Sequence, residues 1–493
     1  MNVFTAILKK LTVVLIAVLL LSAGCSQQKK PDRSRPNVVV IFMDDMGYGD
    51  LASYGAIDYE TPNLDRLAME GMRFTNFYAA QAVCSASRAG LLTGCYPNRI
   101  GITGALMPWA KHGLSDKEMT IAELLKQKGY VTGMAGKWHL GHQKKFLPLQ
   151  HGFDEYLGIP YSNDMWPVGY DGKPITKDTD RPWKLKYPPL PLIDGNKKIG
   201  EFNTFDDQAK MTTMFTERAV NFIKRNKDKP FFFYLAHPMV HVPLAVSDKF
   251  KGKSKQGLFG DVMMEIDWSV GQVLKALKDN GLEDNTIVIY TSDNGPWLNF
   301  GNHAGSTGGL REGKGASWEG GQREPCIVKW PGVVPEGVIC NKLSSTIDIL
   351  PTLAEITGAK LPDHKIDGVS ILPLWKGVKD ANPRDYFLYY YGRNNLENVR
   401  KGNWKLVLPH KYRTYEGFLP GNDGFPGQTG IGESGLELYN LRRDPGEHYN
   451  VIELYPDVVK DIMRIVDKAR EDLGDDLTGH KGKNRRPPGK VDE

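Results

Sequence analysis

Four short apolar segments, each followed at once by polar or ionisable residues, constrain the fold of this chain more than any other feature. The segments cover residues 37–43, 130–135, 231–236 and 285–292 and are rich in β-branched and aromatic residues. Runs of this length and composition are typical of strands that are buried on both faces, as in parallel sheets. Because ligands of open α/β sheets gather beyond the carboxyl ends of the strands, we expect the polar residues that follow these strands to meet at one site.

Segments with helical periodicity separate the predicted strands. Thr61-Pro62 and Thr120 each open one of them, and residues 208–225 and 259–280 carry apolar side chains at three- and four-residue spacing. Alternation of strands and helices predicts a doubly wound α/β domain, with a mostly parallel sheet sandwiched by helices. We place this domain at residues 37–380.

The sequence pattern changes after Pro383. Short alternating segments predict antiparallel strands, and an amphipathic helix follows them, so we expect a smaller C-terminal α+β domain over residues 381–475. The basic tail, residues 476–493, is expected to be loose and solvated, as charge runs commonly are. The predicted elements of the C-terminal domain are the strands 385–391, 397–408 and 436–440 and the helix 456–473.

Residues 1–24 have the layout of a signal peptide. Lys9 and Lys10 precede an apolar run that is too short to span a bilayer, and the segment ends in Leu21-Ser22-Ala23-Gly24-Cys25. Small residues before a cysteine resemble the lipobox of bacterial lipoproteins, which implies cleavage before Cys25 and lipid attachment to it. We therefore expect a protein of the bacterial cell envelope that faces the periplasm, held at the membrane by the lipid, with residues 25–36 as a polar tether. An ordinary signal peptide is the alternative.

Composition excludes several classes of protein. The chain has 493 residues, of which 41% are hydrophobic and 25% charged, so it is neither disordered nor fibrous. It carries 63 Lys+Arg against 58 Asp+Glu. This excess is small for a chain of its length, so we expect no nucleic-acid partner.

Two acidic pairs directly follow two of the predicted strands. Asp44-Asp45 follows the first strand and Asp293-Asn294 the last. Three carboxylates and an amide oxygen are ligands that a hard cation such as Ca²⁺ or Mg²⁺ requires. A single pair of this kind is commonly a turn or a helix cap, but charges at the ends of two buried strands need a partner, which a divalent ion supplies.

The segment around Cys84 carries the most specific pattern. Taken alone, Cys84 fits a low-pKa nucleophile or a packed thiol equally well. The sequence Cys84-x-Ala86-Ser87-Arg88, followed by Leu92-Thr93-Gly94, resembles the signature of the type I sulfatases of the alkaline-phosphatase superfamily. The resemblance extends over almost the whole mature chain, from 36–38 to 438–445, through 136–141, 292–295, 313–315 and 318–321.

This resemblance implies a fold, a modification and a set of roles. It implies an alkaline-phosphatase-like fold and oxidation of Cys84 to Cα-formylglycine by a formylglycine-generating maturation enzyme. It implies a metal, Ca²⁺ with Mg²⁺ as the alternative, held together with residue 84 by Asp44, Asp45, Asp293 and Asn294. The other implied roles are that Arg88 holds the modified side chain, that Lys137 and His139 flank it, and that Lys137, His241 and Lys314 contact the sulfate.

The chemistry of a sulfate monoester agrees with these roles. The site must attract an anion and stabilise the developing negative charge on the leaving oxygen, and the metal and the basic side chains supply that field. An aldehyde hydrate carries two hydroxyl groups on one carbon. One attacks sulfur while the alcohol leaves, and the other then gives its proton to His139 as aldehyde and sulfate form.

Spacing gives further expectations for the basic residues. Lys137 and His139 are two residues apart on chain predicted to be extended, so both are expected to point to one side. His237 and His241 have the spacing of a zinc pair on a helix, but the prolines beside them argue against a regular helix. We assign His241 to the substrate and expect His237 to pack or cap.

The expected substrate is a sulfated carbohydrate. Residues 161–187 include Trp166 and Trp183 among polar residues, and Asn302 and His303, after the second metal pair, are candidate sugar contacts. The stretches 294–297 and 301–305 look most like the arylsulfatase A and N-acetylgalactosamine-6-sulfatase branch, which favours sulfated galactose or N-acetylgalactosamine. The alternatives are a phosphomonoesterase or phosphodiesterase on the same scaffold, and a non-catalytic envelope lipoprotein that binds sulfated glycan.

The remaining cysteines, Cys95, Cys326 and Cys340, lie in no motif. An oxidising envelope would allow one pair of them to form a disulfide. Buried free thiols are the default expectation.

Overall fold

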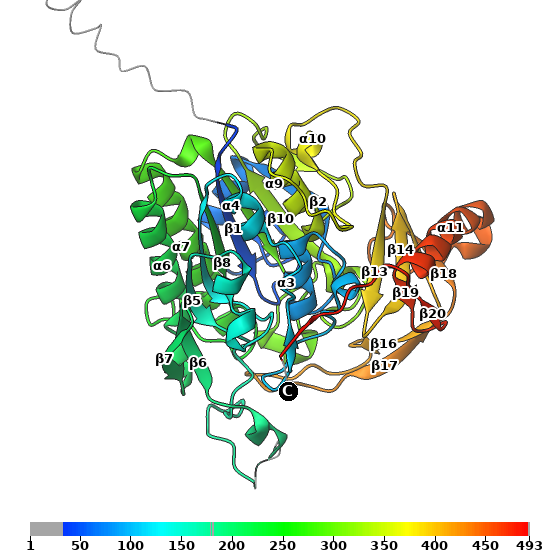
Figure 1. Ribbon diagram of the computed structural model, residues 1–493. Coiled ribbons are helices and arrows are strands. Elements are labelled where there is room, and N and C mark those ends of the chain that lie inside the picture. Colours follow the sequence, from blue (N-terminus) through cyan, green and yellow to red (C-terminus); the bar gives the residue numbers. More distant parts are fainter. Residues whose placement is uncertain (1–32, 178, 180–181, 492–493) are drawn as a thin grey trace, which may run out of the picture. The chain divides into compact units, whose positions relative to one another are not determined.

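The four predicted strands lie side by side at the centre of an 11-stranded mixed sheet (Figure 1). A computed structural model describes residues 33–177, 179 and 182–491, so the predicted signal peptide and Cys25 lie outside the described residues. The central strands run parallel in the order β9-β1-β8-β4. Their bounds are β1 (Asn37–Met43), β4 (Val131–Lys137), β8 (Phe231–Ala236) and β9 (Thr286–Ser292).

Strands on both sides extend this centre. The whole order is β11-β2-β10-β9-β1-β8-β4-β5-β6-β7, with β12 paired to β2. Strand β10 runs antiparallel to β2 and β9, and β6 runs antiparallel to β5 and β7, whereas β11 and β12 pair parallel with β2, so the sheet is mixed on both sides of its parallel centre. The outer strands are β2 (Met72–Tyr78), β5 (Glu155–Ile159), β6 (Leu190–Asp194), β7 (Lys197–Phe202), β10 (Arg323–Lys329), β11 (Val338–Cys340) and β12 (Ser344–Ser345).

Helices cover both faces of the sheet, as predicted (Figure 1). Val39, Ile41 and Met43 of β1 pack on one face, and the alternate residues Val38 and Val40 pack on the other. A strand buried on both faces in this way explains the unbroken apolar run. The first face carries α2 (Pro62–Met69), α6 (Met211–Arg225) and α7 (Gly257–Asp279), and the second carries α3 (Cys84–Thr93), α4 (Ile121–Lys126) and α9 (Ile349–Thr357).

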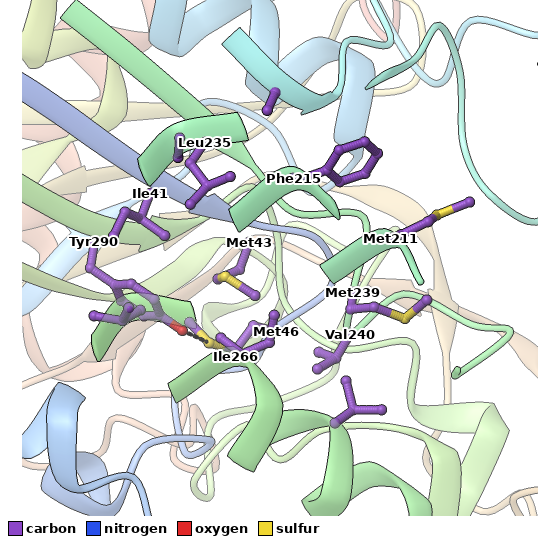
Figure 2. Packing of buried hydrophobic residues seen from close by; sticks show 14 of the residues in the cluster. Ile41, Met43, Met46, Met211, Phe215, Leu235, Met239, Val240, Ile266 and Tyr290 are labelled. Carbon is purple, nitrogen blue, oxygen red and sulfur yellow. Dashed lines mark hydrogen bonds between the residues drawn. The ribbon is translucent and has the colours of Figure 1, made fainter. Parts of the chain in front are cut away.

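Methionines fill the first face beneath the carboxyl ends of the strands (Figure 2). Met43 and Met46 lie there with Phe215 of α6 and Ile266 of α7, all fully buried. The hydroxyl of Tyr290 on β9 lies 3.1 Å from the Met46 sulfur. This packing fixes the chain directly after β1, where the first acidic pair lies. The short helices α5 (Phe205–Gln208), α8 (Glu319–Gln322) and α10 (Leu372–Trp375) complete the helical layer.

The C-terminal domain is built on a four-stranded antiparallel sheet in the order β13-β14-β15-β18. Gly402, with φ 55°, turns the predicted segment 397–408 into a hairpin. Helix α11 packs on this sheet, and Tyr78 and Tyr96 of the larger domain join the same core. The elements are β13 (Tyr386–Tyr391), β14 (Asn395–Lys401), β15 (Trp404–Val407), β16 (His410–Thr414), β17 (Gly430–Ser434), β18 (Glu437–Asn440), α11 (Pro456–Asp472), β19 (Gly474–Asp475) and β20 (His480–Lys481).

The basic tail returns to the larger domain. Strand β21 (Gly489–Lys490) pairs with β3 (His112–Gly113). The guanidinium of Arg486 donates to both carboxylate oxygens of Glu118, at 2.6 and 2.8 Å. The prediction of a loose, solvated tail is therefore wrong for these residues, because a buried carboxylate far away in the sequence binds the tail.

Three of the cysteines are structural. Cys95, Cys326 and Cys340 are buried with free thiols, which confirms the default expectation. Cys326 and Cys340 both lie opposite Phe74, one on either side of β2. Strands separated by a third strand are about 9.5 Å apart, which is beyond the reach of a disulfide.

No helix in the described part of the chain has the length and apolar character needed to cross a membrane.

Candidate active site

The predicted acidic pairs meet at the carboxyl edge of the sheet. Strands β1 and β9 run parallel and end in register, so the residues that follow them lie next to each other. The main-chain N–H of Asp45 donates to Asp293 Oδ1 at 3.2 Å, and the amide of Asn294 donates to Asp45 Oδ1 at 2.8 Å. Asp44, Asp45, Asp293 and Asn294 are all buried.

The oxygens of these residues fit a divalent cation. Asp44 Oδ1 and Asn294 Oδ1 are buried without a hydrogen-bond partner in the described structure. Ligand atoms of Asp44, Asp45 and His241 lie within 4.8 Å of one another. Burial, and then the neighbouring Asp44, raise the pKa of Asp293 to about 7. Such crowded, unpaired carboxylate and amide oxygens are the donor set that a hard cation satisfies.

Basic residues already pair with this acidic group. Burial alone would raise the pKa of Asp44, but Lys137 and His241 hold it well below its usual range. Lys137 Nζ lies 2.5 Å from Asp44 Oδ2, and Lys314 Nζ lies 2.7 and 2.8 Å from the two oxygens of Asp45. The site therefore combines metal-type ligands with cations that attract an anion.

Cys84 is the first residue of α3 and is buried beside these charges. Burial raises the pKa of its thiol to about 11, against the lowering effect of Lys137 and Lys314. An unmodified thiol at this place is protonated at neutral pH, and the protonated thiol is a poor nucleophile. The interpretation of Cys84 as a low-pKa nucleophile is therefore not favoured by its surroundings.

Arg88 lies one helical turn after Cys84. Its Nε and Nη2 donate to Asp293 Oδ2 at 3.0 and 2.7 Å, and its Nη1 donates to the Lys137 carbonyl oxygen at 3.1 Å. These contacts fix a predicted metal ligand and the end of β4 relative to α3. The resemblance implied that Arg88 holds residue 84. In the structure, Arg88 instead contacts Asp293 and the Lys137 carbonyl oxygen.

A glycine positions Lys137 at the end of β4. Gly136 has φ 111°, and a Cβ there would lie 1.8 Å from the Ala236 carbonyl oxygen on the neighbouring strand. Only glycine permits this approach. Lys137 then turns into the site, where its ammonium also donates to Ser162 Oγ at 3.1 Å.

His139 does not lie on extended chain. Its φ is 59°, so the expectation of extended chain, on which it would point to the same side as Lys137, is wrong at this residue. The imidazole is nevertheless buried, and its Nε2 lies 3.0 Å from the Leu106 carbonyl oxygen. The pKa of His139 is well below its usual range, chiefly through burial and then through Lys137 and Arg88.

His237 and His241 have different surroundings. His241 Nε2 lies 3.6 Å from Asp45 Oδ2, and its ring packs edge-to-face on Trp297. His237 instead contacts Ser269 Oγ of α7 at 3.0 Å within the core. The expectation that His237 packs while His241 faces the site agrees with this arrangement.

Asn302 and His303 lie apart from this cluster. Asn302 is exposed, and its amide exchanges two hydrogen bonds with Asp423 of the C-terminal domain, at 2.9 and 2.7 Å. His303 is half-buried beside the same loop, near Gly424. The Asn302 amide is therefore committed to the contact between the domains, and the structure does not bring it together with Cys84.

Ser162 and Asp164 lie near the site but are not among the predicted site residues. Both follow β5, which lies beside β4 in the sheet. The signal was present, because Ser162-Asn163-Asp164 is a polar group that comes after a buried strand, as at the other strands.

Comparison with known proteins now decides the family. The sulfatase family profile matches residues 36–359, and the profile of the C-terminal region of aryl-sulfatase matches residues 382–487. The chain belongs to the sulfatase family. A profile of the C-terminal part of N-sulphoglucosamine sulphohydrolase also matches this sulfatase, at residues 313–414.

Individual relatives agree with this assignment. The sulfatase is 38% identical to N-acetylgalactosamine-6-sulfatase of Mus musculus, over 94% of this chain and 90% of that protein. It is 38% identical to arylsulfatase A of Homo sapiens, over 85% and 83%. The crystal structure of Ps i-CgsB in complex with k-i-k-neocarrahexaose superposes with a TM-score of 0.70 at 28% identity, over 88% of this chain and 92% of that one. The predicted type I sulfatase of the alkaline-phosphatase superfamily, a sulfuric ester hydrolase, is thus confirmed.

Proposed function

We propose that this sulfatase removes sulfate from a glycan of the galactose or N-acetylgalactosamine type. In this proposal residue 84 acts as Cα-formylglycine, and Ca²⁺, with Mg²⁺ as the alternative, binds to Asp44, Asp45, Asp293 and Asn294. The observation that carries the proposal is the position of Cys84, buried at the start of α3 among Lys137, Lys314 and the acidic pairs. The name of one relative above, N-acetylgalactosamine-6-sulfatase, supports the sugar.

Formylglycine and the cation would supply the reactive chemistry. As its hydrate, formylglycine provides a nucleophilic hydroxyl and a second hydroxyl that can lose a proton, and the cation provides positive charge at the sulfate. The chain supplies the rest of the field. The buried Lys137 and Lys314 attract the sulfate and stabilise the negative charge that develops on the leaving oxygen.

His139 is arranged to take up a proton. The Leu106 carbonyl can only accept a hydrogen bond, so His139 Nε2 carries the ring proton. Nδ1 then bears the lone pair, and it is buried without a partner in the described structure. Because burial and the nearby cations keep the ring neutral, His139 is ready to accept a proton at Nδ1.

Sulfate release from sulfated galactose and N-acetylgalactosamine tests this function. The protein is matured with a formylglycine-generating enzyme, and Cys84→Ala is the control. We expect release from at least one of these sugars and none from the variant. Turnover of a phosphate monoester in place of every sulfate ester would contradict the proposal.

We also propose that a lipid on Cys25 anchors the sulfatase in the bacterial envelope. The lipobox-like sequence Leu21-Ser22-Ala23-Gly24-Cys25 supports this location. Cys25→Ser is expected to move the protein from the membrane fraction to the soluble fraction of the expressing cells. An unchanged distribution would contradict the anchor.

A further inference from the structure

We propose that Asp164 selects the substrate, because its carboxylate accepts a hydrogen bond from a hydroxyl group of the sugar that carries the sulfate. This inference rests on the proposed function, since it concerns the same site. It adds a specificity-determining residue from the segment that follows β5 (Glu155–Ile159).

The backbone around Asp164 is held against the catalytic cluster. Ser162 Oγ accepts a hydrogen bond from Lys137 Nζ at 3.1 Å. The amide of Asn163 donates to the carbonyl oxygens of His241 and Pro243, at 3.4 and 3.2 Å. A turn closes directly after it, with the Met165 N–H on the Ser162 carbonyl oxygen at 3.1 Å. Asp164 therefore follows two residues that contact Lys137 and the His241 segment.

The Asp164 carboxylate has a hydrogen bond with the Ser162 side chain, but one of its oxygens lacks a donor. Its Oδ1 is buried and has no hydrogen-bond partner in the described structure. Leaving a buried acceptor unsatisfied is unfavourable, and more so when the acceptor is charged. Although burial raises it, the pKa of Asp164 is lowered overall by His241 and Lys314, so the group is ionised and can only accept.

The substrate can supply the missing donor, but not through its sulfate. A sulfate ester presents only acceptor oxygens and carries negative charge, so it is repelled by Asp164 and is drawn to the lysines. A sugar hydroxyl beside the ester is a donor. A carboxylate placed next to an anion-binding group therefore favours a sulfated sugar over a sulfate ester that has no hydroxyl groups.

The Asp164 carboxylate acts electrostatically on one member of a stacked aromatic pair. Trp109 stacks on Tyr187, with ring centroids 5.5 Å apart and an interplanar angle of 16°, and 51% of the Trp109 surface is exposed. Burial, and then the charge of the Asp164 carboxylate, raise the pKa of Tyr187. The exposed indole offers an apolar face to a sugar ring. Trp166, in contrast, is buried against Phe205 and is not available to a ligand.

The test compares two substrates in three variants. The ratio of kcat/KM for a sulfated monosaccharide to kcat/KM for nitrophenyl sulfate, which has no hydroxyl group, is measured in Asp164→Ala, Asp164→Asn and Asp171→Ala. We expect the ratio to fall about 10- to 100-fold in Asp164→Ala, as for loss of a hydrogen bond to a charged group. Asp171 lies on the same connecting segment, but its carboxylate accepts from the Lys173 N–H, so Asp171→Ala leaves the ratio unchanged.

Deoxy sugars identify the hydroxyl group. Removal of the right hydroxyl lowers the ratio in the wild type and causes no further loss in Asp164→Ala, because both changes delete the same hydrogen bond. If Asp164→Ala does not fold, Asp164→Asn keeps the side-chain volume and is expected to change the ratio in the same direction. An unchanged ratio in a folded Asp164 variant overturns this inference alone. A wild type that releases sulfate from neither substrate overturns the proposed function and this inference with it.

Discussion

His139 donates from Nε2 to the Leu106 carbonyl oxygen, and this contact determines which ring nitrogen can act as a base. Leu106 is itself held next to α3, because its N–H donates to Ser85 Oγ at 2.9 Å. Ser85 directly follows Cys84 at the start of α3. One short chain of contacts thus orients the ring of His139 relative to residue 84.

We expect His139→Ala to lower kcat by about 100- to 10,000-fold, the range typical of losing a general acid or base. KM is expected to change little, because His139 does not hold the sulfate in this account. His142→Ala is the matched control, since His142 lies in the same segment and is half-exposed. Steady-state kinetics on one sugar sulfate measure both variants, and a loss of less than tenfold in kcat for His139→Ala would rule out its role as the base.

Removal of the cation is expected to abolish activity and to lower the melting temperature. Without it, Asp44 Oδ1 and Asn294 Oδ1 are buried with no hydrogen-bond partner among the described residues, and the three buried carboxylates are left with Lys137, Lys314 and Arg88 as their lysine and arginine partners. Activity and melting temperature are measured after chelation and dialysis, and again after Ca²⁺ is added back. The same chelator saturated beforehand with Ca²⁺ is the control. Full activity in protein that metal analysis finds free of divalent ions would disprove the metal site.

The buried His237 makes the fold sensitive to acid. Burial lowers its pKa to about 3, whereas an unfolded imidazole titrates at about 6.5. Below pH 6.5 the unfolded state therefore binds a proton that the folded state does not, so the free energy of unfolding falls as the pH falls, down to the folded pKa. This contribution amounts to about 2 kcal/mol between pH 7 and pH 5.

We expect His237→Gln to lose that part of the pH dependence. The measurement is urea unfolding at pH 7 and pH 5, with the exposed His480→Gln as control. The stability of the control is expected to fall between the two pH values as in the wild type, and the stability of His237→Gln is expected to fall less. Equal falls in all three proteins would show that His237 is not the sensitive group.

The docked tail is expected to stabilise the larger domain. Arg486→Ala leaves the buried carboxylate of Glu118 without its bidentate partner, and we expect a loss of about 1–3 kcal/mol in the free energy of unfolding. Lys481→Ala, in the exposed strand β20, is the control and is expected to change stability by less than about 0.5 kcal/mol. Denaturant unfolding measures both, and equal stabilities of the two variants would refute the role of the tail.

Much of the fold could be predicted because its signals are local. A strand buried on both faces is mostly apolar, and β1, β8 and β9 each show this over seven residues or fewer. The docking of the tail could not be predicted in this way. Arg486 and Glu118 are 368 residues apart in sequence, and a basic run carries no sign of one buried acidic partner.

In the site, too, the residues with a local sequence signal could be predicted and the others could not. Asp44, Asp293 and Lys137 were predictable, because each lies at the end of a strand or directly after one, at the edge where parallel strands meet. The left-handed backbone conformation of His139 could not be predicted, because the spacing of residues in the sequence does not determine φ. Asn302 was assigned to the sugar on composition, but its partner is Asp423, and such a pairing between loops leaves no periodic signal.

The mass of the peptide that contains residue 84 tests the central claim most directly. The sulfatase is produced with a formylglycine-generating enzyme, digested and measured, and the sulfate-releasing activity of the same preparation is recorded. We predict a peptide with an aldehyde in place of the Cys84 thiol, in an amount that follows activity from one preparation to the next. Fully active protein in which every such peptide carries an unmodified thiol would contradict the account.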